Sequence, residues 1–120
     1  MLGPLATFPM PTRPELLDLH DEVCAAAHDV MAKKSHDYAA KDDALFNVRQ
    51  CEAFGLCSAE AGVLVRMTDK LSRLSRFEKQ GELAVDDEAV EDTVVDLVNY
   101  SVLLLALFRE RKKNDAPPAC

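Results

Sequence analysis

Residues 88–99 read EAVEDTVVDLVN and are followed by the apolar run YSVLLLALF at residues 100–108. In a helix, at about 100° per residue, four polar side chains of this stretch share a sector of about 80°: Glu88, Asp92, Asp96 and Asn99. Asp96 is flanked by valines and a leucine, and a buried carboxylate without a partner is strongly destabilising. The stretch therefore predicts positive charge at this face, supplied by basic side chains, a metal ion or both.

The acidic face is interpreted as a metal site. Hard oxygen ligands select Mg²⁺ or Mn²⁺ over softer metals. The alternative is a solvated helix N-terminus, where acids complement the macrodipole. That alternative explains Glu88 but not Asp96, which lies two turns further along the helix.

The bulk composition limits the classes of function. A chain of 120 residues with 48% hydrophobic residues is long enough for one globular domain. The net charge of −7 argues against a general binder of nucleic acids or anionic membranes, but not against a nucleotide carried with metal ions. The apolar run is too short for a membrane span, and the N-terminus lacks the basic start of a signal peptide. We expect a cytoplasmic protein (host cytoplasm if phage-encoded) without membrane or nucleic-acid partners.

The hydrophobic periodicity predicts an all-α fold. Helices are expected from Pro14 to about Lys33, near residues 44–54, from Ala59 to Gln80 with Ser58 as N-cap, and from residue 86 or 87 to about Lys112. The polar segment at residues 33–47 is interpreted as a loop. The expected organisation is an extended arm at residues 1–13, a domain at 14–112 and a flexible tail at 113–120.

The last helix is apolar almost all round from residue 94 to residue 108, so it should be covered on every side. In so small a domain, a second subunit is the simplest cover, and a homodimer or homotetramer is expected. The four cysteines have no CxxC spacing and are interpreted as reduced thiols, with Cys24 and Cys51 expected in the core.

Two further polar groups are candidate contacts of a substrate. Residues 66–73 carry Arg66, Asp69, Lys70 and Arg73 on a polar helix face, which in the plain interpretation are ordinary surface ion pairs. In the functional interpretation, Asp69 lies opposite the Asp92–Asp96 turn and the basic residues bind phosphate. The polar segment supplies Lys34, Asp37, Tyr38 and Asn47, either as contacts to phosphate, sugar or base or as a plain exposed loop.

Three blocks of sequence carry a resemblance to a known family. KKSHDYAAKDDALFN (residues 33–47), VRMTDKLSRL (65–74) and DEAVEDTVVDLVNY (87–100) resemble the nucleotide modification associated domain 1 proteins, which are similar to the all-α NTP pyrophosphatases of the MazG and dimeric dUTPase type. The resemblance covers residues 33–107. The MazG signature of ExxE followed by ExxD is altered: RMTD at residues 66–69 replaces ExxE, and Asp92 and Asp96, with Glu88 one turn earlier, replace ExxD.

The resemblance implies a four-to-five-helix bundle of the MazG and dimeric dUTPase type that releases pyrophosphate from a nucleoside triphosphate. Among such enzymes the resemblance is greatest to the MazZ-type phage (d)GTP diphosphohydrolases, which form (d)GMP for 2-aminoadenine metabolism. For this chemistry we expect two or more Mg²⁺ or Mn²⁺ ions on Asp69, Glu88, Asp92 and Asp96, with Asn99 as a ligand or supporting group and Glu91 as a candidate general base.

Several alternatives stay open. The same chemistry on dUTP, dCTP or dATP is compatible with the sequence, as are ribose or deoxyribose substrates. Outside the enzyme class, a non-catalytic helical nucleotide-binding module would bind without forming monophosphate. A structural interaction protein would use the last helix only as an oligomer interface.

Overall fold

A computed structural model describes residues 11–38, 45–80 and 87–114 of the chain. Its elements are α1 (Arg13–Tyr38), the short 3₁₀ helix η2 (Asn47–Arg49), α2 (Gln50–Ala53), α3 (Ala59–Gln80) and α4 (Asp87–Asn114). Within these ranges all regular structure is helical, which confirms the predicted all-α class. Residues 1–10 and 115–120, which make up most of the expected arm and tail, lie outside the described residues.

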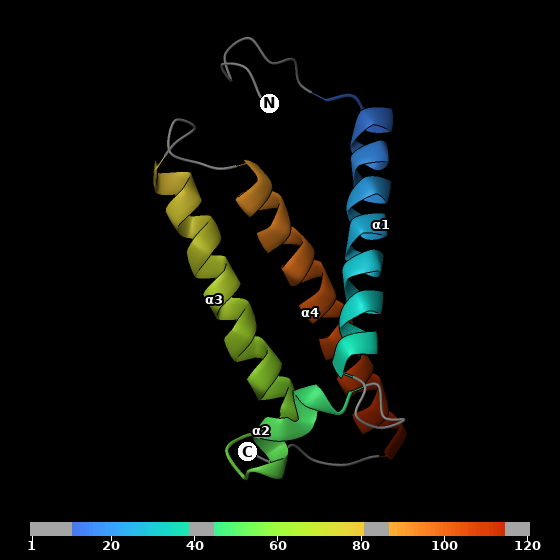
Figure 1. Ribbon diagram of the computed structural model, residues 1–120, viewed down its shortest axis with the longest axis vertical. Helices are drawn as coiled ribbons and strands as arrows, with labels where there is room; N and C mark the ends of the chain where they lie inside the picture. Colours follow the sequence, from blue (N-terminus) through green and yellow to red (C-terminus); the bar gives the residue numbers. More distant parts are fainter. Residues whose placement is uncertain (1–10, 39–44, 81–86, 115–120) are drawn as a thin grey trace.

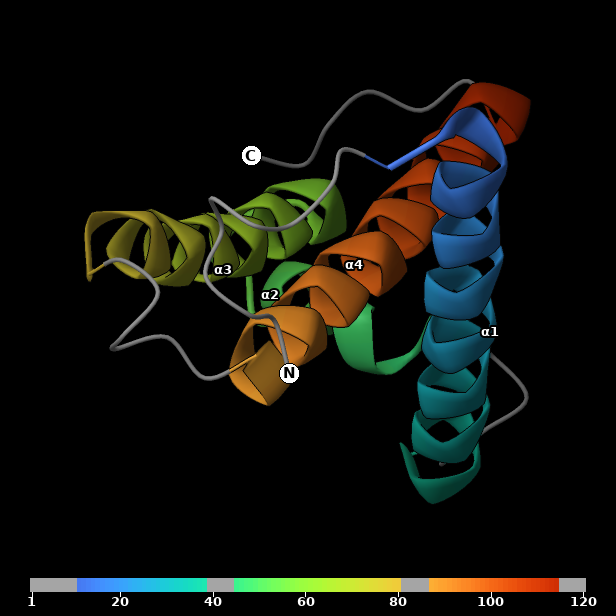
Figure 2. The same cartoon turned by 90° about the horizontal axis from the view of Figure 1, so that it is seen from above.

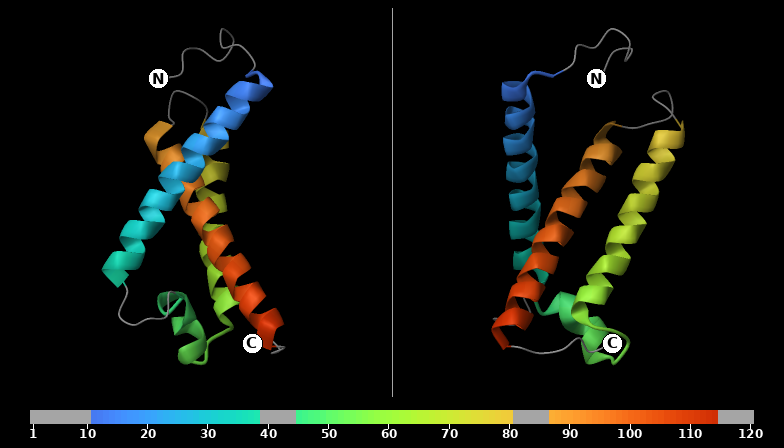
Figure 3. Two further views of the ribbon diagram at one scale, coloured as in Figure 1. Left: turned by 90° about the vertical axis from the view of Figure 1, so that its right-hand side faces the viewer. Right: turned by 180° about the vertical axis from the view of Figure 1, so that it is seen from behind.

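The three long helices are arranged around α4. α3 and α4 run antiparallel side by side, and α1 packs against α4 on its other side (Figure 1). The view from above shows α4 between α1 and α3 (Figure 2). α1 crosses α4 obliquely, and η2 and α2 lie at one end, beside the start of α3 (Figure 3). α4 is therefore the element that joins the other two long helices.

The boundaries of α2 and α3 follow from local chemistry. Gly55 has φ +76°, a left-handed conformation that glycine adopts without strain, and it ends the α2 turn. The Oγ atom of Ser58 accepts a hydrogen bond from the N–H of Ala61 at 3.1 Å, which caps the first turn of α3. The predicted limits of α3 and its cap are thus confirmed.

The predicted end of the first helix is wrong. α1 continues past Lys33 through Tyr38, so the first part of the polar segment is helix rather than loop. No glycine or proline occurs between Glu15 and Tyr38 to stop it, and polar residues are compatible with a helix. At its start, the N–H of Glu15 donates to Oγ1 of Thr12 at 3.3 Å.

A buried hydrophobic cluster lies between α3 and α4, near the end where α2 joins. It is formed by Ala59, Val63 and Leu107, and partly buried side chains surround it: Leu45, Val48, Met67, Tyr100 and Leu104. Along α1, Ala27 is buried. Cys24 is exposed, so the expectation that it lies in the core is wrong.

One face of α4 remains open in the single chain. Val102, Leu105 and Phe108 are 50%, 48% and 45% exposed. The expectation that α4 is covered on every side is therefore not met by the described residues of one chain.

Candidate functional site

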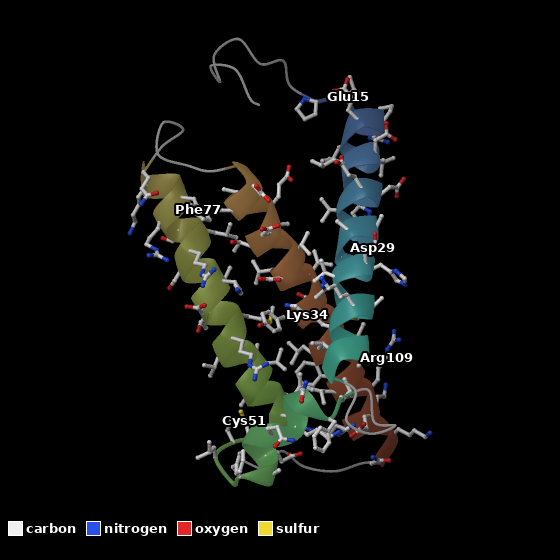
Figure 4. All side chains as sticks on the ribbon, in the orientation of Figure 1. Glu15, Asp29, Lys34, Cys51, Phe77 and Arg109 are labelled. Atoms are coloured by element: carbon white, nitrogen blue, oxygen red, sulfur yellow. The ribbon has the colours of Figure 1, made fainter. Side chains whose placement is uncertain are left out.

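Charged side chains from all three long helices come together at Asp96 of α4. The Nζ atom of Lys70, on α3, lies 2.9 Å from Oδ2 of Asp96, on α4. Lys34 extends from α1 towards the other two helices, and its Nζ atom lies 4.0 Å from Oδ1 of the same carboxylate (Figure 4). The Lys70 and Asp96 side chains are only 15% and 26% exposed, whereas Lys34 is 56% exposed.

This arrangement confirms that Asp96 is withdrawn from bulk water and faces positive charge. Within the described chain that charge comes from lysine side chains. Two ammonium groups against one carboxylate leave one positive charge in excess. Partial burial reduces the screening of the Lys70 and Asp96 charges by solvent, whereas the excess charge lies on the more exposed Lys34. The Lys34–Lys70–Asp96 cluster therefore presents a positive charge that an anion in solution can reach.

Asp69 occupies a different position from the one expected. Lys70 faces Asp96, while Asp69 is 66% exposed and its Oδ2 lies 3.8 Å from Nε of Arg73 on the same helix. Adjacent helical residues differ by about 100° in direction, so only one of the pair can face α4. Arg66 is exposed, and Arg73 is 47% exposed in its pair with Asp69.

The other acidic residues lie on the first turns of α4. Glu88, Glu91 and Asp92 are exposed, whereas Asp96 is half-buried. In the part of the chain that the structure describes, no three His, Cys, Asp or Glu side chains come close enough to hold a metal ion together. The predicted set of Asp69, Glu88, Asp92 and Asp96 is thus not gathered around one point in the single chain.

Asn99 has a structural contact that the sequence did not indicate. Its Nδ2 donates a hydrogen bond to the backbone carbonyl of Ala27 in α1 at 3.0 Å. This bond ties α1 to α4 one turn from Asp96 and so helps to set the position of Lys34.

The remaining candidate contacts lie around the connection that follows α1. Asn47 is exposed at the start of η2. Asp37 and Tyr38 belong to the last turn of α1, but their side chains lie outside the described part of the structure.

Two ion pairs at the α2 end were missed by the sequence analysis. The Nη1 and Nη2 atoms of Arg49 donate to Oε1 and Oε2 of Glu110 at 2.5 and 2.6 Å, a bidentate pair between η2 and α4. Arg111 pairs with Glu60, which is 7% exposed in the first turn of α3. No local spacing in the sequence signals pairing between residues so far apart along the chain.

Comparison with known families gives one match. The family described as nucleotide modification associated domain 1 matches residues 34–107, which include Lys34, Lys70 and Asp96. The match spans more than half of the chain, which therefore belongs to this family. No curated protein and no solved structure matches the chain. No helix in the described ranges has both the length and the apolar character needed to cross a membrane.

Proposed function

We propose that this chain is a nucleoside triphosphate pyrophosphohydrolase whose phosphate-binding site is the Lys34–Lys70–Asp96 cluster. The observation that carries the proposal is the contact of two lysines, from two helices, with one half-buried carboxylate. All three residues lie in the segment matched by a nucleotide-modification family. A nucleoside triphosphate supplies the anionic oxygens that the excess positive charge favours.

In this proposal Lys70 and Lys34 exchange the Asp96 carboxylate for phosphate oxygens when substrate binds. Lysine is a compact point charge on a flexible stem, so it can make this exchange without movement of the helix. Arg66 precedes Lys70 and Arg73 follows it, each by about one turn of α3. In this proposal the two arginines contact outer phosphate oxygens. The lysines then stabilise the charge that develops on the leaving pyrophosphate.

The donor set also suits a magnesium–nucleotide complex. Mg²⁺ at phosphoryl-transfer sites is usually held by one or two carboxylates together with substrate phosphates, rather than by a protein-only cage. Asp96 and Asp92, one turn apart on α4, fit that requirement, with Glu88 a further turn away. Such an ion would lower the pKa of a bound water and so supply the nucleophile. Two or more ions belong to the same proposal, but Asp69, which pairs with Arg73 rather than facing α4, is left out of their ligand set.

The finer assignments rest on the family resemblance. They are (d)GTP as substrate and (d)GMP and pyrophosphate as products. Glu91, an exposed carboxylate on the first turns of α4, is proposed on its position alone as the residue that accepts the proton of the attacking water. dUTP, dCTP and dATP are the alternative substrates. We further propose that a second copy of the chain covers the open face of α4, since Val102, Leu105 and Phe108 are each about half exposed.

The test is a panel of NTPs and dNTPs with Mg²⁺ or Mn²⁺, in which chromatography measures nucleoside monophosphate and pyrophosphate. Asp96→Asn is expected to reduce turnover by about 100-fold or more, because its charge meets both lysines and the metal–nucleotide complex. Asp29→Asn is the matched control, since Asp29 is 86% exposed on α1 and is expected to leave turnover unchanged.

The same assay separates the rival functions. Binding of nucleotide without monophosphate formation by the unmodified chain would identify a non-catalytic binding module. A chain whose thermal stability does not respond to Mg²⁺ and nucleotide would contradict both nucleotide-binding functions. Full turnover by Asp96→Asn would show that the cluster is not the site.

A further inference from the structure

Two half-buried thiols converge at the end of the molecule where α2 joins α3. Cys51 belongs to α2, and Cys57 lies in the turn just before Ser58 (Figure 4 labels Cys51). A Cβ atom placed on the buried Gly62 of α3 would lie 2.9 Å from Sγ of Cys51 and 4.0 Å from Sγ of Cys57. Both sulfur atoms therefore lie within 4.0 Å of one point, in space left by the missing side chain of Gly62.

The backbone of the turn also draws the two cysteines together. The carbonyl oxygen of Cys51 accepts hydrogen bonds from the N–H groups of Leu56 and Cys57 at 2.9 and 3.5 Å. Gly55, at φ +76°, provides the reversal that makes this possible. A disulfide requires Cα atoms within about 7 Å, and a turn closed in this way holds the two backbones close, while both Sγ atoms lie on the side of Gly62.

We propose that Cys51 and Cys57 form a dithiol site that low-molecular-weight disulfides oxidise to an internal disulfide. One thiolate attacks the small disulfide, forms a mixed disulfide and releases one small thiolate. The second thiolate then attacks the sulfur of the first cysteine, so the Cys51–Cys57 bond forms and the second small thiolate leaves. Two protein thiols lose their protons and are oxidised, and one small disulfide is reduced to two thiols. This site is independent of the proposed nucleotide chemistry.

Cys24 provides a built-in comparison. It is exposed on α1, and its Sγ lies 3.8 Å from Nδ1 of His20. Its close neighbour is an imidazole, so oxidation there should stop at the mixed disulfide. A difference in product between Cys24 and the Cys51–Cys57 pair then reports the geometry of the pair rather than general thiol reactivity.

The experiment treats the full-length chain with millimolar oxidised glutathione, blocks remaining thiols by alkylation and maps the peptides by mass spectrometry. The internal disulfide is expected to exceed glutathione adducts at Cys51 and Cys57 by about tenfold or more, because the second thiol is already held beside the first. Cys24 should carry glutathione. In Cys57→Ser, Cys51 should accumulate the glutathione adduct, and Cys51→Ser should give the same result at Cys57.

Three outcomes would overturn the proposal. They are separate adducts on Cys51 and Cys57 in the unmodified chain, a reduced pair beside a modified Cys24, or pairing of either cysteine with Cys24 or Cys120. Circular dichroism of both serine variants verifies that each is folded, and either folded variant alone suffices for the comparison.

Discussion

The Nζ atom of Lys70 lies 2.9 Å from Oδ2 of Asp96 across the α3–α4 interface, and both side chains are largely shielded from water. Removing either member leaves the other charge partly buried without its nearest partner. We expect Lys70→Met and Asp96→Asn each to lower the free energy of unfolding by about 1–3 kcal/mol. A double-mutant cycle by urea denaturation should give a coupling energy of about 1 kcal/mol or more.

The control cycle is the exposed pair of Arg73 and Asp69, whose Nε and Oδ2 atoms are 3.8 Å apart. Its coupling should be about 0.5 kcal/mol or less, because both side chains are well solvated. Equal coupling in the two cycles would contradict the partial burial of the Lys70–Asp96 pair.

Lys34 should affect anion binding more than stability, because it is 56% exposed and 4.0 Å from Asp96. Lys34→Met is expected to weaken binding of pyrophosphate about 3- to 10-fold in a calorimetric titration, and the loss should diminish at high salt. Lys33→Met is the matched control, since the adjacent exposed lysine has a different direction around α1. Identical affinities for the two variants would remove Lys34 from the site.

Asn99→Ala should loosen α1 from α4, because it removes the hydrogen bond to the carbonyl of Ala27. The expected cost is about 1 kcal/mol, with faster hydrogen exchange in the middle of α1. Ser101→Ala serves as control, since the Ser101 hydroxyl donates only within α4, to the carbonyl of Leu97 at 2.8 Å. Unchanged exchange in α1 for Asn99→Ala would argue against this contact as a tether.

Glu60→Gln should be strongly destabilising, because it leaves the Arg111 guanidinium beside a neutral and almost fully buried partner. The free energy of unfolding is expected to fall by about 3–5 kcal/mol. Glu110→Gln, whose side chain is 40% exposed, should cost less. Thermal denaturation of both variants tests the order, and a larger loss for Glu110→Gln would reverse the roles assigned to the two ion pairs.

Val63→Ala should lower the free energy of unfolding, because Val63 lies in the buried cluster between α3 and α4. Val63 is 1% exposed, so its truncation is expected to cost about 1–2.5 kcal/mol. Val65→Ala is the same substitution two residues along α3, at a position that is 65% exposed, and should stay within about 0.5 kcal/mol. Chemical denaturation distinguishes these values, and similar losses would mean that another surface covers Val65.

The helices, and the presence of positive charge beside Asp96, could be predicted from the sequence. Ser58 is a local cap, and Gly55 a local helix terminator, so both act through chemistry that neighbouring residues reveal. Asp96 stands out because apolar neighbours surround it in the sequence. These patterns can be recognised in the sequence without knowledge of the tertiary structure.

The rotation of α3 about its own axis and the ion pairs between residues distant in the sequence could not be predicted in the same way. Asp69 and Lys70 are adjacent, and the choice between them as the partner of Asp96 depends on how α3 is turned against α4. The polar residues after Lys33 resembled a loop because their helical conformation depends on the absence of a terminator rather than on an apolar pattern. Glu60 and Arg111 meet only once the chain is folded.

The attachment of α1 has a consequence for control of the cluster. α1 brings Lys34 to Asp96. It packs against α4, to which the hydrogen bond from Asn99 attaches it. A small slide or tilt of this one helix would therefore change the electric potential at Asp96 while the Lys70 contact stays in place. The position of α1 thus sets how strongly the cluster attracts anions, while the α3–α4 pair keeps its own geometry.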